Sequence, residues 1–120
     1  MSYISGFVCA VPIGNKQAFI DHAGETAAFF KEYGALRIVD TWGEDVPDGE
    51  LTSFPLAVKA EDNEVVAFSW VEWPSKDACD RCMTAMQTDP RMSPETNPMP
   101  FDGKRLIFGG FVPVLDTNAA

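Results

Sequence analysis

The hydrophobic pattern of the chain is organised around residues 64–92, which read EVVAFSWVEWPSKDACDRCMTAMQTDPRM. Within them, residues 65–73 are largely apolar at both sets of alternate positions, and alternate positions of a strand point to opposite faces of a sheet. A sheet with one face in water alternates apolar and polar residues instead. We therefore predict a central strand over 65–73 that is covered on both faces. Helices of the same chain can cover one face, and the other face needs a partner or a ligand.

The first third of the chain predicts a strand, a helix and a second strand. Residues 3–11 are again apolar on both faces and predict a strand. A helix is expected over 16–33, with Asn15 as its N-cap and Gly34 as its left-handed C-terminal stop. A second strand is expected over 35–43.

The predicted helix carries two stripes at helical spacing. The stripe expected to be buried consists of Phe19, Ala23, Ala27 and Phe30. The stripe beside it is more amphipathic, and it either faces a cleft or a neighbouring subunit or forms the edge of a wide core face. Its members are His22, Thr26, Phe29 and Tyr33.

The segment between the second strand and the central strand is polar and less regular. Residues 44–51 contain Pro47-Asp48-Gly49 and predict a loop. Residues 52–60 fit either a helical turn capped by Thr52 or Ser53 or an edge strand, and we favour the turn.

The last third repeats the order of the first. Ser75 is expected to cap a second helix, which stops at Asp89-Pro90 because proline lacks an N–H and disfavours helix before it. Residues 89–103 contain four prolines and predict an irregular loop. Residues 104–115 predict the last strand.

The resulting order, βαββαβ, is typical of the ferredoxin-like (split βαβ) fold in the α+β class, with a four-stranded antiparallel sheet. All the helices are expected on one face of the sheet. We expect a single domain over 1–120, since 120 residues suffice for one core. The other face would expose apolar side chains, and large exposed patches of that kind mark interfaces. We therefore predict a homodimer in which two sheets pack face to face.

The composition and charge of the chain exclude several classes of binding partner. The chain has 18 acidic and 9 basic residues and a net charge of −9, so nucleic acid and anionic membrane surfaces are not expected as partners. No apolar run approaches the length of a membrane span or opens the chain as a signal peptide, which predicts a cytoplasmic protein. No glycine-rich loop lies between a strand and a helix, and we expect no cofactor.

Cys79-Asp-Arg-Cys82 matches C-x-x-C, which can bind a metal or perform redox chemistry. Zinc would need two further ligands, and Cys9 and His22 are the only other cysteine and histidine in the sequence. Because both cysteines share the apolar stripe of the second helix, we favour buried packing and expect no metal.

Two side chains are candidates for acid–base chemistry. His22 is the only histidine, the residue type whose unperturbed pKa lies near neutrality, although a structural helix histidine is the plainer interpretation. Glu72 ends an otherwise apolar strand face, so it is either a general base or half of an ion pair with Arg37, Arg91 or Arg105.

A cleft for a small apolar molecule is expected between the sheet and the proline-rich loop. Its candidate lining residues are Trp42, Phe68, Trp70, Phe101 and Arg105.

Four runs, at 34–49, 57–76, 89–92 and 99–111, resemble the small bacterial proteins of domain-of-unknown-function family 1428. The resemblance covers nearly the whole chain. It implies a fold similar to the dimeric α/β barrel group, which includes antibiotic-biosynthesis-type monooxygenases, muconolactone-isomerase-like enzymes and haem-degrading enzymes. The family has no activity that can be transferred, so the resemblance implies no catalytic residue.

These observations favour a cofactor-independent enzyme, monooxygenase-like or isomerase-like, that acts on a small apolar or aromatic molecule. Two alternatives stay open: a non-enzymatic small-ligand-binding or stress-related module, and a haem- or metal-using member of the same superfamily.

Overall fold

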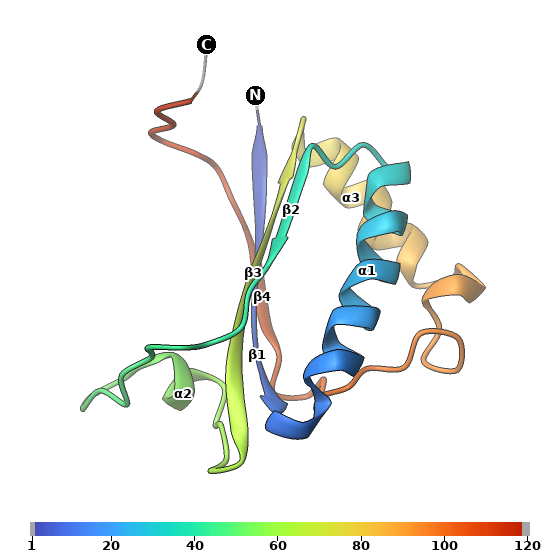
Figure 1. The fold of residues 1–120 in the computed structure, drawn as a ribbon. Coiled ribbons are helices and arrows are strands. Elements are labelled where there is room, and N and C mark those ends of the chain that lie inside the picture. Colours follow the sequence, from blue (N-terminus) through green and yellow to red (C-terminus); the bar gives the residue numbers. More distant parts are fainter. Residues whose placement is uncertain (1, 119–120) are drawn as a thin grey trace.

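The computed structural model describes residues 2–118 and contains one four-stranded antiparallel sheet in the order β2-β3-β1-β4. Figure 1 shows the sheet edge-on, with α1 and α3 on one side. We call that side the helix face and the opposite side the outer face. The order confirms the ferredoxin-like prediction. The elements are β1 (Tyr3–Pro12), α1 (Lys16–Glu32), β2 (Arg37–Asp40), α2 (Phe54–Ala57), β3 (Glu64–Trp73), α3 (Lys76–Met86) and β4 (Ile107–Phe111), with 3₁₀ turns η1 (Ile13–Asn15) and η2 (Pro90–Met92).

The central pair of strands, β1 and β3, is fully matched along its length. It runs in register from Tyr3 opposite Trp73 to Pro12 opposite Glu64. Val71 and Trp73 point to the helix face and are buried there, whereas Val66 is buried on the outer face. The helix face of the central strand is covered as predicted, whereas on the outer face only the end near Val66 is covered by this chain and Phe68 stays exposed.

The core of the helix face is centred on Trp73, which is completely buried. Its ring packs on Phe30 with centroids 5.6 Å apart. Its indole Nε1 donates to Ser5 Oγ at 3.0 Å, and Ser5 Oγ lies 3.2 Å from Cys79 Sγ. Burial raises the pKa of the Cys82 thiol to about 12. Cys82 therefore stays a protonated, apolar packing group, as the helix pattern predicted.

The outer face differs from the prediction that all helices lie on one side of the sheet. The segment before β3 crosses to the outer face and carries α2 with it (Figure 1). Phe54 of α2 packs edge-on against Phe68 with centroids 6.0 Å apart, and Val58 is buried in the outer-face cluster. Ser53 Oγ accepts from Leu56 N at 3.1 Å, which confirms the predicted cap of this turn.

The two edge strands are shorter than predicted, and each is paired on one side only. β2 covers 37–40 instead of 35–43, and β4 covers 107–111 instead of 104–115. Beyond β2, Gly43 N still donates to Val66 O at 2.8 Å. A Cβ on Gly43 would stand 2.6 Å from that carbonyl oxygen, so the close approach of the two backbones requires glycine.

The predicted helix ends are confirmed at three positions and in part at a fourth. Ser75 Oγ accepts from Ala78 N at 3.2 Å, Gly34 has a φ of 99°, and α3 ends before Pro90. Asn15 stands at the N-cap position of α1, but its side chain makes no capping hydrogen bond there. Its Nδ2 donates instead to Pro100 O at 2.8 Å, which ties the proline-rich loop to the start of α1.

No helix among residues 2–118 has the length and apolarity needed to cross a membrane.

A bidentate ion pair holds the start of β4 against the start of β3. Arg105 Nη1 and Nη2 donate to the two Glu64 oxygens at 2.6 and 2.7 Å, and the Glu64 side chain is almost fully buried. These hydrogen bonds hold the pKa of Glu64 below its ordinary value of 4.5. A group whose pKa falls on folding stabilises the fold above its unfolded-state pKa and loses that contribution as pH falls through the folded-state value.

We therefore predict that Glu64→Gln lowers the Tm at pH 7 and at pH 5, and that the difference from wild type shrinks below pH 4.5. Thermal unfolding followed by circular dichroism at pH 7, 5 and 3.5 measures this. Glu61→Gln, at an exposed position three residues away, removes the same charge and should leave the Tm nearly unchanged. Equal Tm values for Glu64→Gln and wild type at pH 7 would contradict the prediction.

Candidate functional site

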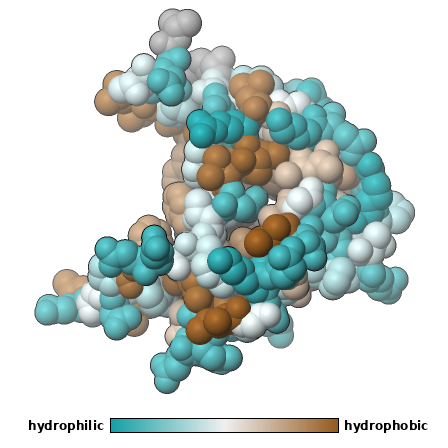
Figure 2. Space-filling view, viewed as in Figure 1, coloured by the Kyte–Doolittle hydropathy of each residue, from teal (hydrophilic) through white to brown (hydrophobic). Residues whose placement is uncertain are grey.

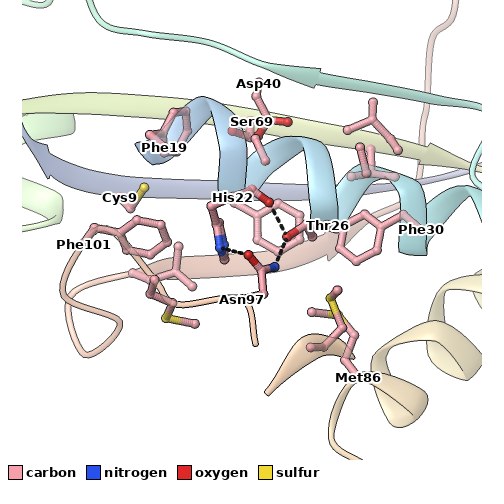
Figure 3. Close-up of a pocket in the computed structure, with 18 of the residues that line it drawn as sticks. Cys9, Phe19, His22, Thr26, Phe30, Asp40, Ser69, Met86, Asn97 and Phe101 are labelled. Atoms are coloured by element: carbon pink, nitrogen blue, oxygen red, sulfur yellow. Dashed lines mark hydrogen bonds between the residues drawn. The ribbon is translucent and has the colours of Figure 1, made fainter. Parts of the chain in front are cut away.

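A cavity of about 170 Å³ lies between the sheet and α1 and is closed at one side by the loop that follows α3 (Figure 3). Most of its lining is apolar. The lining residues are Phe19, His22, Ala23, Thr26, Ala27 and Phe30 of α1; Phe7, Cys9, Ile38, Asp40, Ser69 and Val71 of the sheet; Met86 of α3; and Met92, Pro94, Asn97, Met99, Phe101 and Leu106 of the loop.

The cavity exists because α1 presents small side chains at its centre. Ala23 and Ala27 face the sheet between the larger Phe19 and Phe30, which pack at the two ends of the helix stripe. Protein interiors are normally filled to crystal-like density, so an open space of this size is the candidate binding site of the chain. The stripe predicted to be buried therefore forms one wall of a cavity.

The loop over the cavity is fastened by ion pairs and hydrogen bonds. Arg91 Nη1 donates to Glu32 Oε2 of α1 at 2.6 Å, and its guanidinium lies 5.0 Å from the centre of the Phe29 ring. Arg91 also pairs with Asp89 at 2.9 Å. Together with the bond from Asn15 to the Pro100 carbonyl, these contacts hold the loop against both ends of α1.

Three polar side chains form a hydrogen-bonded chain at the cavity wall (Figure 3). His22 Nδ1 lies 3.0 Å from Asn97 Oδ1, Asn97 Nδ2 donates to Thr26 Oγ1 at 3.2 Å, and Thr26 Oγ1 donates to the His22 carbonyl at 2.9 Å. Because the Thr26 hydroxyl gives its proton to a carbonyl, it accepts from the Asn97 amide nitrogen, which leaves the amide oxygen for His22. Nδ1 of His22 therefore carries the proton in the neutral ring.

This tautomer makes Nε2 of His22 the basic nitrogen. Nε2 has no hydrogen-bond partner among residues 2–118. Every buried side-chain nitrogen or oxygen among these residues does have a partner, so Nε2 is not a buried atom. Nε2 is therefore open to the cavity or to solvent. Phe101 packs edge to face on the imidazole with centroids 5.8 Å apart and limits the orientations of the ring. An imidazole that is oriented through one nitrogen and free at the other can act as a general base.

The sheet contributes a second polar group of cavity residues. Asp40 of β2 pairs with Ser69 of β3, and Cys9 of β1 lies near them. Burial, and then the charge of Asp40, raise the pKa of the Cys9 thiol to about 12. Cys9 therefore stays protonated at neutral pH and is a poor nucleophile.

The described part of the chain contains no group of three or more His, Cys, Asp or Glu side chains that could hold a metal ion. His22 and Cys9 line the cavity, whereas Cys79 and Cys82 lie on the buried side of α3, in the core.

The structure brings together only some of the residues expected at the site. His22 and Phe101 line the cavity, and Trp42 packs on Phe19 beside it with centroids 5.8 Å apart. Phe68, Trp70 and Glu72 alternate along β3 with the cavity residues Ser69 and Val71, and they therefore point to the outer face.

The environment of Glu72 is defined by β2. Arg37 stands opposite Glu72 in the strand register, and its guanidinium lies 5.3 Å from the centre of the Trp70 ring. The other two expected partners, Arg105 and Arg91, pair with Glu64 and Glu32. Arg105 accordingly does not line the cavity. A catalytic role for Glu72 stays a prediction, and it would have to operate on the outer face.

Four polar cavity residues were missing from the predicted site. Thr26 belongs to the same helix stripe as His22, and Asp40 and Ser69 interrupt otherwise apolar strand faces, so a pattern marked each of them. Asn97 carried no such signal. It lies in an irregular loop 75 residues from its partner His22, and only the tertiary fold brings the two together.

Comparisons with known proteins agree with the fold. The crystal structures of SnoaB, a cofactor-independent oxygenase from Streptomyces nogalater, superpose with TM-scores of 0.62 for a mutant and 0.57 for a second structure. Their sequence identities are 19% and 17%, over 98% of this chain and 98% and 97% of theirs. At these identities the likeness shows the fold alone.

Other proteins share a much higher sequence identity with this chain than the SnoaB structures do. The uncharacterized protein YbaA of Escherichia coli K12, and the YbaA of Shigella flexneri, are 53% identical over 116 residues, which is 97% of this chain and 99% of theirs. Residues 2–103 match the family described as "Protein of unknown function (DUF1428)". The chain therefore belongs to the DUF1428 family, in which its relatives are bacterial proteins.

Proposed function

We propose that the protein is a cofactor-independent enzyme in which His22 removes a proton from a small apolar, aromatic molecule held in the cavity on the helix face. The observation that carries this proposal is the hydrogen-bonded chain from His22 through Asn97 to Thr26, set in a lining that is otherwise mostly apolar. The fold shared with SnoaB, a cofactor-independent oxygenase, supports it.

The chemistry follows from the positions of the two imidazole nitrogens. A C–H bond next to a carbonyl, or a phenolic O–H, breaks, its proton moves to Nε2, and its electron pair stays on the substrate as an enolate or phenolate. Asn97 Oδ1 accepts from Nδ1–H and stabilises the imidazolium that forms. Return of the proton to a different carbon gives an isomerase. Transfer of one electron from the enolate to dissolved O₂ gives a radical and superoxide, which recombine to form a C–O bond; the resulting peroxide takes the proton back from the imidazolium and loses water to leave a new carbonyl, which is the reaction of an oxygenase.

A first prediction tests the cavity as the binding site. Ala23 lines the cavity at the middle of α1, and Leu in its place would fill the space. Ala28 lies on the exposed face of the same helix. We expect wild type and Ala28→Leu to bind the fluorescent probe 2-naphthol with equal Kd, and Ala23→Leu to bind at least about tenfold more weakly, a loss typical of a blocked apolar pocket.

Fluorescence titration and circular dichroism of the three proteins distinguish blocked binding from misfolding. Equal binding by Ala23→Leu and wild type would place the probe elsewhere and contradict the proposal.

A second prediction tests the base. The protein should accelerate exchange of the acidic CH₂ protons of 2-tetralone in D₂O, measured by proton NMR, and His22→Gln should slow this exchange about 100-fold, as loss of a general base does. The 2-naphthol Kd should change little, because the cavity keeps its shape.

If His22→Gln exchanges at the wild-type rate while binding is retained, His22 is not the base and the cavity serves binding alone. An oxygen electrode then separates the two enzyme classes for wild type, since only an oxygenase consumes O₂ with its substrate.

We further propose that the protein is a homodimer formed through the outer face. Figure 2 shows that side hollowed between the α2 segment and residues 112–118. Large apolar side chains on this face are between two-fifths and three-fifths exposed, namely Phe54, Phe68, Ile107 and Phe111. Burying such a patch is the main source of free energy in stable protein interfaces.

Light scattering at about 10 μM protein should give twice the 13.2 kDa mass of the chain, since stable dimers commonly have Kd values far below this concentration. Phe68→Glu should give the monomer mass, because it places a charge in the middle of the outer face. Leu51→Glu adds the same charge at a fully exposed loop position and should leave the dimer intact. A monomeric wild type would contradict the dimer proposal but not the cavity proposal.

A further inference from the structure

An acidic residue lies where the strand pattern calls for an apolar one. Ile38 and Asp40 of β2 both point to the helix face, and both line the cavity. Asp40 is exposed at the edge of the cavity, and its strand partner Ser69 is buried deeper on the central strand. In Figure 3 the two side chains lie together on the sheet wall, away from Asn97. The fold already has many acidic surface residues, so Asp40 is not needed there for solubility.

The charge of Asp40 is not neutralised by the protein. Asp40 forms no ion pair with any residue of 2–118, and the cavity lining contains neither lysine nor arginine. Ser69 Oγ likewise has no hydrogen-bond partner among these residues. Every buried side-chain oxygen among them does have a partner, so Ser69 Oγ is not fully buried. Because Ser69 lines the cavity, its hydroxyl is accessible from there. The sheet wall therefore presents one negative charge and one free hydroxyl to a ligand.

We propose that Asp40 and Ser69 form a selectivity subsite that accepts a hydroxyl or ammonium donor of the ligand. The substrates of the cavity are then neutral or cationic hydroxylated aromatics, and aromatic carboxylates are excluded. This inference rests on the proposed function, because it assumes that the ligand occupies the cavity beside His22.

Two physical effects both favour a cationic ligand over an anionic ligand at this subsite. A ligand carboxylate that enters the cavity loses hydration to an apolar lining, and it also meets the like charge of Asp40. A ligand ammonium loses hydration too, but it gains a charge-assisted hydrogen bond to the Asp40 carboxylate. Because Asp40 lies at the exposed edge of the cavity, solvent reduces both effects, and we expect discrimination of about tenfold instead of the larger values of fully buried charges.

The test uses three ligands with the same phenol ring and a different second substituent. They are 4-hydroxybenzylamine, which is cationic, 4-hydroxybenzyl alcohol, which is neutral, and 4-hydroxybenzoate, which is anionic. Their Kd values are measured by NMR titration at low salt. Because His22 is the only histidine, its ring Cε1–H resonance reports occupation of the cavity without ambiguity.

Two variants isolate the charge of Asp40. Asp40→Asn keeps the size of the side chain and removes its charge. Asp45→Asn removes one charge from an exposed loop outside the cavity and controls for the change in net charge. Wild type and Asp45→Asn should bind the amine and the alcohol at least about tenfold more tightly than the carboxylate. In Asp40→Asn this preference for the amine over the carboxylate should fall to within about threefold.

The outcomes separate this inference from the proposed function. Binding of all three ligands with similar Kd values in wild type overturns the selectivity subsite and leaves the cavity proposal standing. A preference that persists unchanged in Asp40→Asn also overturns the subsite. An unchanged His22 resonance with all three ligands shows that none occupies the cavity, and it overturns the proposed function together with the subsite.

Discussion

The pairing of β1 with β3 is the constraint on which the other features of this protein depend. The two strands match over ten residue pairs, and the side chains of each alternate between a helix face and an outer face. A shift of one residue would exchange the two sets and turn the cavity side chains to the outside. Trp73, through its hydrogen bond to Ser5 of β1, joins the two strands at one end and adds a specific contact to the backbone register.

Because of this alternation, the two faces of the sheet present different sets of side chains. On the helix face, β3 contributes Ser69 and Val71 to the cavity, and on the outer face it contributes Phe68 and Trp70 to an exposed apolar surface. In the proposed dimer, each chain would use one side of the same strand for chemistry and the other for assembly. A substitution on β3 therefore bears on the helix face or on the outer face according to whether its number is odd or even.

Much of the fold could be predicted from the sequence, because local signals set it. The apolar strands, Gly34 and the caps Ser53 and Ser75 act within a few residues of the elements that they end or begin. The side of the sheet taken by α2 was not predictable, since it depends on how a long polar segment crosses the sheet edge. Edge-strand lengths were overestimated because apolar composition does not reveal how many residues have a neighbour to pair with.

The site was predictable only in part, for a similar reason. The helix stripe indicated His22 and Thr26. Glu72 and Trp70 were also predicted at the site, but they lie on the face of β3 that points away from the cavity. Asp40 and Ser69 were visible as polar interruptions, but only the structure shows that they surround the same space as His22. Asn97 required the tertiary fold, because its role depends entirely on a partner on another element.

The position of Asn97 has a consequence for the proposed proton transfer. The amide that orients His22 belongs to the same loop that closes the cavity, and that loop is fastened through Arg91 and Pro100 at either side of Asn97. Any movement that lifts the loop to admit a ligand also withdraws the acceptor from Nδ1. In the proposed enzyme, the base would therefore be complete only while the loop lies over the cavity, and the imidazole would be aligned for proton transfer while the substrate is shielded from water.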